Sequence, residues 1–458
     1  MPLKKLLLKA GVNRENTRYT SEGGWYECDK IRFRQGTPEK IGGWQRISAA
    51  NFQGICRSLW NWVTLGSQNL IGVGTNLKFY LENGGQYNDI TPLRATLTLT
   101  NPFETVSGSP IVTVTDAAGG YKDGDFVTFS GATAVGGLTL NGEYEITFTE
   151  AVNEYAIDAG ANASSSATGG GTVTAAYQIN VGTGFAIPIT GWGASAWGFG
   201  TWGVGETSVE SIRLWTQSNF GEDLIFGPRG GAIYYWEANS GISSRGVELS
   251  TLSGASGVPT TQNCLEISDI NRFVFAFGAN EFGTSIVNPM LVRWSDQGSA
   301  VNWTPSATSQ AGFLTLSRGS EIVTSKQARQ EVLVWTDSAL YAMQYVGAPV
   351  VWSAQLVGEN ISIAGQNAVA YANGVAYWMG KDKFYKYDGR TQPLRCDLRK
   401  FIFDDFNTQQ YDQIVSGTNE SYHEIWWFYC STGQTVSDRY VVYNYLEDVW
   451  YYGTMSRT

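Results

Sequence analysis

The chain has 458 residues, enough to bury a large core, and its hydrophobic and aromatic contents of 43% and 14% exclude a disordered chain. Only 16% of the residues are charged, the net charge is −10 and the sequence pI is about 4.8, which argues against a general nucleic-acid binder. The 54 glycines are typical of short strands joined by tight turns, so we predict a nearly all-β fold.

The charge is distributed unevenly along the chain. Residues 1–47 carry ten basic and five acidic side chains, a net charge of +5, which leaves −15 for the remainder. We predict a basic N-terminal arm over residues 1–50 that either contacts an acidic neighbour or lies solvated. Its candidate contact residues are Arg32, Arg34 and Trp44.

Cysteines and apolar runs give little sign of export. No stretch approaches the ~18 apolar residues of a membrane span, and the apolar run in "MPLKKLLLKAG" is too short for a signal peptide. The five cysteines form no CxxC pair, so we expect reduced, half-buried thiols rather than a disulfide framework or a zinc site. They are Cys28, Cys56, Cys264, Cys396 and Cys430.

Six segments share one design: an apolar strand, a turn with Gly, Asn, Asp or Ser, and a strand that ends near aromatic residues. They cover residues 69–82, 223–237, 272–296, 331–344, 374–388 and 424–445. Each pattern predicts a β-hairpin. The aromatic anchors Tyr235, Trp294, Tyr341, Tyr385 and Tyr443 are spaced by 59, 47, 44 and 58 residues. Strand-only repeats of roughly 40–50 residues predict a β-propeller of about six blades.

One interval is too long for this repeat. The step from Tyr80 to Tyr235 is 155 residues, and its first part contains short alternating strands without the aromatic ending. We therefore place a first blade at residues 51–96, an inserted small β-domain at 97–181, a Gly/Trp-rich connector at 182–207 and the remaining blades at 208–458. Residues 393–407 are expected to hold one short helix, and "GGWQRI" is a candidate strand to complete the last blade.

Residues able to carry chemistry are few. The single histidine, His423, excludes a catalytic triad or a multi-histidine metal site and is interpreted as structural. Three adjacent carboxylate pairs are interpreted as surface or turn residues rather than glycosidase acids. These pairs are Asp404–Asp405, Glu222–Asp223 and Glu447–Asp448. In "RWSDQGSAVNWTP" we predict a tight turn in which Asp296 bonds to nearby backbone and Gly298 has a positive φ. No catalytic, metal-binding or cofactor-binding residue is predicted.

The connector contains "GWGASAWGFGTWGVG", in which Trp192, Trp197 and Trp202 lie five residues apart with Phe199 among them. This spacing fits neither one face of a strand nor one face of a helix, so we expect the glycines to make successive tight turns. The bulky side chains and the missing helix exclude a dinucleotide-binding loop. The rings either pack against the propeller, the insert or a neighbouring subunit, or stack on a sugar or base. We favour packing.

Several stretches resemble one family. "GVNRENTRYTSEGGWYECDKIRFRQGTPEKIGGWQRI" resembles the N-terminal arm of bacteriophage tail proteins of the packaged-DNA stabilisation, or tail-nozzle, type. "GWGASAWGFGTWG" followed by "IRLWTQSNFGEDLIFGPRGGAIYYWE" is similar to the same group, as is "VRWSDQGSAVNWTP". The resemblance covers most of the chain, and the inserted domain is its least specific part.

The resemblance implies a structural virion protein without catalytic residues, made in the host bacterial cytoplasm and placed in the tail. It implies a homo-hexameric ring below the portal and its adaptor, the head-to-tail connector protein. That ring would retain packaged DNA, dock tail fibre or tail plug proteins, and let genomic DNA pass through its lumen without sequence-specific binding. An acidic body suits such a channel because it repels the DNA phosphates.

A second interpretation belongs to a different class: a carbohydrate-binding β-propeller that acts in receptor binding or as a depolymerase component. A lectin propeller should repeat one aromatic and polar cluster in every blade, whereas the tryptophan cluster occurs once. A propeller hydrolase is a third interpretation, which the single histidine opposes.

Overall fold

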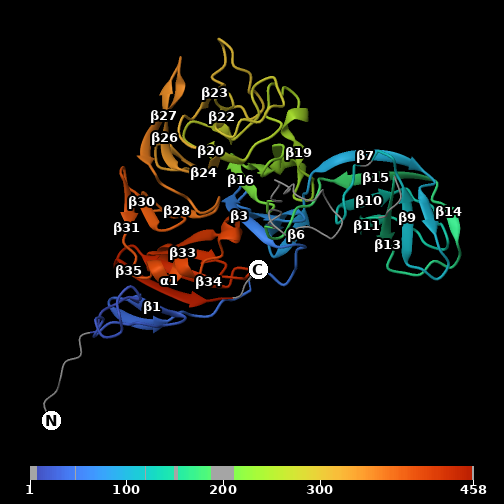
Figure 1. Ribbon diagram of the computed structural model, residues 1–458. Helices are drawn as coiled ribbons and strands as arrows, with labels where there is room; N and C mark the ends of the chain where they lie inside the picture. The colour runs from blue at the N-terminus through green and yellow to red at the C-terminus, as the bar shows by residue number, and fades with distance from the viewer. Residues whose placement is uncertain (1–7, 47, 119, 149–152, 187–210, 456–458) are drawn as a thin grey trace, which may run out of the picture.

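The computed structural model describes residues 8–46, 48–118, 120–148, 153–186 and 211–455. Six four-stranded antiparallel sheets follow one another along the chain and are arranged as blades around a common centre (Figure 1). A two-sheet domain projects to one side of them, and a small N-terminal hairpin lies beyond the last blade. The prediction of an all-β propeller of about six blades, with an inserted β-domain and an N-terminal arm, is therefore confirmed.

The first three blades are each built from four consecutive strands. Blade 1 contains β3 (Cys56–Val63), β4 (Asn69–Thr75), β5 (Phe79–Asn83) and β6 (Gln86–Asp89). Blade 2 contains β16 (Trp215–Phe220), β17 (Asp223–Pro228), β18 (Tyr234–Trp236) and β19 (Val247–Glu248), with the 3-10 helices η1 (Ala238–Ser240) and η2 (Leu249–Thr251). Blade 3 contains β20 (Cys264–Ser268), β21 (Phe273–Phe277), β22 (Leu291–Trp294) and β23 (Gly312–Thr315).

The last three blades follow the same plan. Blade 4 contains β24 (Ile322–Gln327), β25 (Val332–Thr336), β26 (Ala339–Gly347) and β27 (Val351–Glu359). Blade 5 contains β28 (Val369–Ala372), β29 (Val375–Met379), β30 (Phe384–Tyr387) and β31 (Thr391–Leu394). Blade 6 contains β32 (Val415–Asn419), β33 (Glu424–Tyr429), β34 (Arg439–Asn444) and β35 (Val449–Thr454).

The six hairpins predicted from the sequence are the second and third strands of the six blades. These strands have a partner on both sides and a neighbouring blade on each face, so nearly every side chain is buried. In β21 and in β25, for example, all five residues are buried. First and fourth strands leave one edge free and include more exposed residues, as β32 and β23 do. That difference explains why only the middle pair of each blade has a clear apolar pattern.

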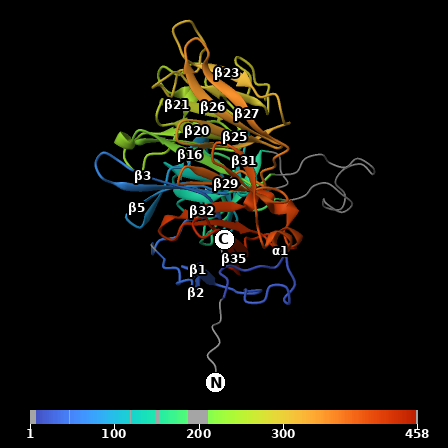
Figure 2. The same ribbon diagram turned by 90° about the vertical axis from the view of Figure 1, so that its left-hand side faces the viewer.

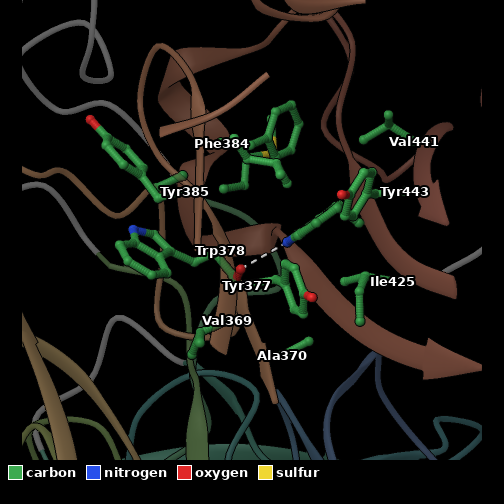
Figure 3. Close-up of a cluster of buried hydrophobic side chains, with 14 of the residues drawn as sticks. Val369, Ala370, Tyr377, Trp378, Phe384, Tyr385, Ile425, Val441 and Tyr443 are labelled. Atoms are coloured by element: carbon green, nitrogen blue, oxygen red, sulfur yellow. Dashed lines mark hydrogen bonds between the residues drawn. The ribbon is translucent and has the colours of Figure 1, made fainter. Parts of the chain in front are cut away.

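Neighbouring blades are joined by apolar clusters. Separate clusters connect blade 1 to blade 2, blade 2 to blade 3, and blade 3 to blade 4, and a larger one runs through blades 4, 5 and 6. In Figure 3, Tyr377 of blade 5 lies toward Ile425 and Tyr443 of blade 6, while Trp378 is turned the other way. Trp378 meets Trp335 of blade 4, with ring centroids 5.4 Å apart. Blade 5 is thus held on both faces by aromatic side chains.

The inserted domain is a sandwich of two sheets that leaves blade 1 after β6. One sheet has the order β11 (Gly142–Glu145), β10 (Phe126–Ser130), β15 (Thr172–Gln178), β7 (Leu93–Thr100). The other has the order β12 (Thr147–Phe148), β13 (Glu154–Asp158), β9 (Ile111–Thr115), β8 (Phe103–Thr105), β14 (Ala167–Gly169). The insert begins four residues before its predicted start at position 97. Its first strand, β7, pairs with β15 from Leu93 onward, with a bulge between Tyr177 and Gln178.

A buried charge network fixes the insert to the propeller. Lys78 of blade 1 forms ion pairs with Glu143 of the insert and, at 3.6 Å, with Asp89. Gln178 Nε2 donates to Glu143 Oε2 at 2.7 Å, and Arg245 of blade 2 approaches Asp89 at 3.4 Å. Because Lys78 is buried and forms ion pairs with two carboxylates, these contacts hold the insert in a defined position on blades 1 and 2.

The arm forms its own two-stranded sheet, β1 (Ile31–Arg34) with β2 (Thr37–Lys40), against blade 6. Figure 2 shows both strands below β35, at the opposite end of the molecule from β23. The expectation that "GGWQRI" completes the last blade is wrong, because residues 42–46 form no strand and blade 6 already has four strands of its own. The short helix expected within 393–407 is confirmed as α1 (Arg399–Asp404). The 3-10 helix η3 (Thr408–Gln413) precedes blade 6, and η4 (Glu420–Tyr422) joins its strands β32 and β33.

Candidate interaction site at the arm and the ring seam

Arg32 anchors the arm to blade 6 through a buried ion pair. Its Nε lies 2.9 Å from Glu424 Oε1 and its Nη2 donates to Oε2 at 3.1 Å. The guanidinium also stacks over the ring of Tyr422, with Cζ 3.5 Å from the centroid. Both charged side chains are almost completely buried, so this ion pair, with its hydrogen bond from Nη2, holds the arm in a defined position on blade 6.

Glu424 accepts from three further donors within blade 6. The Trp426 indole N–H donates at 2.8 Å, the Asn419 amide at 3.3 Å, and the Tyr451 hydroxyl also donates to it. The pKa of Tyr451 is raised by burial and by this carboxylate, so the phenol stays a donor. Removing the counterion of such a buried carboxylate is strongly destabilising, because the charge left behind is uncompensated.

Other arm residues bind the same blade through the backbone. Val12 N donates to Trp450 O at 2.7 Å, and Thr454 N donates to Asp29 Oδ1 at 2.8 Å. Phe33 is buried between Trp25 and Tyr451. Arg34, the second predicted contact, lies on the exposed side with Cζ 5.9 Å from the Tyr422 ring. The arm is therefore part of the folded unit.

Trp44, the third predicted contact, lies where the arm leaves blade 6 and turns toward blade 1. Its ring meets the edge of Trp426 at 6.2 Å while 57% of the residue stays exposed. Two cavities, of about 220 and about 630 Å³, are lined in part by this side chain. The smaller cavity lies between Arg57 of blade 1 and Val415 of blade 6, so Trp44 marks the seam where the ring closes.

The seam between blades 6 and 1 differs from the other five interfaces. No apolar cluster of the described residues joins these two blades. On β3, Leu59 and Val63 remain 66% and 60% exposed, and Val415 on β32 is 39% exposed. Ser58 and Trp60, the alternate residues of β3, instead bond to blade 2 through Gln217 and Asn219. One face of β3 is thus packed and the other is open.

Polar contacts cross this seam instead. Arg57 is 9% exposed, donates to Gly184 O, and belongs to no ion pair of the described residues. Burial lowers the pKa of its guanidinium. Gln410, ahead of blade 6, exchanges two hydrogen bonds with the backbone of Ala186, at 2.8 and 3.1 Å. Arg229 of blade 2 pairs with Asp412 at 2.7 Å. The chain leaving the insert therefore ties blade 6 to blades 1 and 2.

A further cavity lies where loops of blades 2 to 6 meet. This cavity has a volume of about 590 Å³, within the size range of small-ligand sites. Its polar lining includes Arg229, Gln262, Glu321, Asp337, Lys381 and Tyr411. Ala186 and Ser211, which border the tryptophan-rich segment, also line it. Trp192, Trp197, Phe199 and Trp202 lie outside the described residues.

The groups considered for chemistry have structural partners. His423 is exposed in a left-handed conformation, φ 58°, with Nδ1 3.3 Å from the Tyr445 hydroxyl. Asp296 Oδ1 accepts from the adjacent Gln297 N at 3.0 Å and Gly298 has φ 73°, which confirms the predicted turn.

The three carboxylate pairs also bind their own fold. Glu447 accepts from the backbone of Gln35 at 2.6 Å, which links blade 6 to the arm. Asp448 accepts from the Tyr443 hydroxyl at 2.9 Å, and Asp223 accepts from Ala238 N at 2.8 Å. Glu222 accepts from Leu65 N, Asp405 lies 3.6 Å from Arg439, and Asp404 is exposed.

The cysteines form no disulfide among the described residues. All five cysteines are free, but Cys264, Cys396 and Cys430 are buried rather than half-buried, and the first two belong to the apolar clusters between blades. Burial raises the pKa of the Cys56 thiol to about 11. Within the described ranges, no three His, Cys, Asp or Glu residues are grouped to hold a metal ion, and no helix is long and apolar enough to cross a membrane.

The class that this geometry defines is an all-β propeller closed by an N-terminal arm. No protein-family model and no curated protein matches the chain. Phage phi92 endosialidase is 12% identical with a TM-score of 0.23, over 86% of this chain and 55% of that one. Puromycin hydrolase is 11% identical with a TM-score of 0.34, over 91% and 56%. An ancestral GH74 enzyme is 9% identical with a TM-score of 0.33, over 91% and 53%. The chain thus spans about half the length of these proteins, and such distant likeness assigns it no function.

Proposed function

We propose that this chain is a structural, non-catalytic protein of a bacteriophage tail, of the nozzle or hub type. Six copies form a ring below the portal adaptor, through which genomic DNA passes without sequence-specific binding. The ring retains packaged DNA and docks tail fibre or tail plug proteins. This assignment rests on the sequence resemblance of the arm and of residues 191–203, 212–237 and 292–305.

One structural observation carries the proposal: the arm, the segment with the most extended resemblance, is built into the propeller as a structural element. Its Arg32 lies against Glu424, and the backbone at Gln35 bonds to Glu447. Five of the six carboxylates in the adjacent pairs form contacts that hold the arm, the blades and their turns. Polar side chains that are engaged in structural hydrogen bonds and ion pairs support a structural protein rather than an enzyme.

Electron microscopy tests this proposal directly. We expect purified full chain, alone or with the portal adaptor, to give closed six-fold rings, and native mass spectrometry to give the mass of six copies. In the phage particle, the ring should lie on the tail axis. Trimeric copies at the periphery, at fibre tips, would contradict the nozzle assignment.

A carbohydrate-binding propeller is the second candidate, and the 590 Å³ cavity is the observation that favours it. Its lining mixes charged and amide side chains with Tyr411, a composition suited to the hydroxyls and apolar faces of a sugar. A glycan array probed with the full chain tests this candidate. Binding that is lost in Lys381→Ala but kept in Lys386→Ala, on the same blade and outside the cavity, would favour it over the nozzle.

A further inference from the structure

The insert exposes one sheet edge that differs from its other three. The two sheets end in β11, β12, β14 and β7, which have four, two, three and eight residues. Proteins commonly protect sheet edges by keeping them short or by placing proline or lysine on them. β7 is long, and the run Ala95–Thr100 contains no proline and no charged residue. Its free side is therefore open to another strand.

The backbone of β7 offers regular donors and acceptors on that side. Asn101 N donates to Gly171 O at 2.8 Å, so the odd-numbered residues of this strand bond to β15. In an antiparallel ladder the alternate residues point the other way. The N–H and C=O groups of Thr96, Thr98 and Thr100 thus face outward. No strand of the described chain lies beside them.

The sequence of this edge is a palindrome, Thr96-Leu97-Thr98-Leu99-Thr100. In an antiparallel pair of two copies centred on Thr98, Thr98 faces Thr98 and Thr96 faces Thr100. The outward backbone groups then meet in hydrogen-bonded pairs, each exchanging both bonds. A shift of one residue would place threonines against leucines and break this match. Sequence and backbone thus select the same register.

Side chains on both faces suit the same arrangement. On the exposed face, Thr98 lies beside Thr174, which lies beside Ser130, so a neutral row of hydroxyls ends at the free edge. A second copy continues this row without bringing like charges together. On the core side, the half-buried Leu97 of each copy lies opposite the partner's Leu99.

We propose that two copies of this chain associate through β7, with a two-fold axis at Thr98 and a continuous eight-stranded sheet across the two inserts. β7 starts at the propeller and runs along the rim of the insert away from it (Figure 1). Antiparallel pairing therefore sends the two propellers to opposite ends of the joined sheet. This isologous contact uses a different surface from the head-to-tail contacts that close a six-fold ring, so the two proposals can fail separately.

Single cysteines at the edge test the register. We expect purified full-chain Thr98→Cys to be joined as a dimer by a short bis-maleimide, because paired Cα atoms are about 5.5 Å apart. Thr96→Cys alone should stay unjoined, since its two copies are about 14 Å apart along the strand. A mixture of Thr96→Cys and Thr100→Cys should be joined. The wild-type chain controls for its own cysteines.

Sedimentation velocity gives an independent result. The wild type should show a concentration-dependent dimer at micromolar concentrations, Thr98→Lys should abolish it, and Thr174→Lys, exposed on the adjacent strand, should keep it. A wild type that stays monomeric, or joining at Thr96 alone as efficient as at Thr98, would overturn the proposal. Six-fold rings without joining at Thr98 would overturn it while leaving the nozzle assignment intact.

Discussion

The five ordinary blade interfaces and the seam between blades 6 and 1 hold the ring by different means. Each ordinary interface contains an apolar cluster, such as the Trp335–Trp378 contact between blades 4 and 5. At the seam, the face of β3 that would meet blade 6 leaves Leu59 and Val63 exposed, and the contacts are polar. Apolar burial stabilises by about 25 cal/mol per Å² without demanding exact geometry. The seam depends instead on polar contacts, which form only where the segments that connect the blades are correctly positioned.

This contrast shows how the ring closes without sharing a strand between its two ends. The arm covers the free face of blade 6, and residues 48–55 continue along blade 1, where Phe52 meets Tyr80 and Tyr87. From the other side, the insert's exit segment bonds to Gln410. The contacts of the arm and of the insert's exit segment therefore take the place of the apolar cluster that the seam lacks.

Removing an aromatic ring from an ordinary interface should cost most. Trp378→Ala deletes a fully buried side chain between blades 4 and 5, and we expect a loss of about 3–5 kcal/mol in the free energy of unfolding. Trp44→Ala, the same change at the seam, should cost under about 1 kcal/mol, because that side chain is largely exposed. Urea unfolding followed by circular dichroism measures both. Equal losses would contradict the distinction between the interfaces.

Breaking the arm's ion pair should have the next largest effect. Arg32→Met leaves the buried Glu424 carboxylate without its counterion, with an expected cost of about 3 kcal/mol and faster trypsin cleavage of the arm. Arg34→Met, at the end of the same strand β1 but exposed, should change stability by less than about 0.5 kcal/mol.

The double variant Arg32→Met with Glu424→Gln sharpens this result. Because no buried charge is then left unpaired, part of the lost stability should return. A double variant as unstable as the sum of its two single variants would show that the arm is held by something other than this pair.

The sequence predicts the fold well for strands that are buried on both faces. It predicts the seam poorly, because the contacts there join residues that are far apart in the sequence. The middle hairpins were predictable because their strands are apolar on both faces. Arg32 was selected from charge and resemblance, but its partner Glu424 lies 392 residues further along the chain. Nothing in the sequence distinguishes Glu424 from other glutamates that lie in strands. Arg57, Gln410 and Asp412 were missed because polar residues before or within first strands carry no periodic signal.

A buried carboxylate between blades 3 and 4 should make an ordinary interface sensitive to pH. Burial raises the pKa of Glu266 to about 7, although the charge of Lys326 and two backbone N–H groups oppose the shift. The unfolded chain releases this proton near pH 4.5, so between about pH 4.5 and 7 the folded state holds more protons and stability falls as pH rises. The expected loss is about 1–3 kcal/mol.

Glu266→Gln should remove this part of the pH dependence, because the amide does not titrate. The exposed Glu281→Gln serves as the matched control and should leave it unchanged. Urea midpoints measured from pH 4.5 to 8 test both variants. An unchanged slope in Glu266→Gln would show that the carboxylate is solvated in the folded protein.

The smallest effect should come from the open face of the seam. Leu59→Ala removes a side chain that is 66% exposed, so the free energy of unfolding should change by less than about 0.5 kcal/mol. Leu340→Ala, the same substitution at a fully buried position of blade 4, should cost about 2–5 kcal/mol. Urea unfolding of the isolated chain gives both values. If Leu59→Ala cost as much as Leu340→Ala, blades 6 and 1 would share an apolar contact in solution, and the seam would be a sixth ordinary interface.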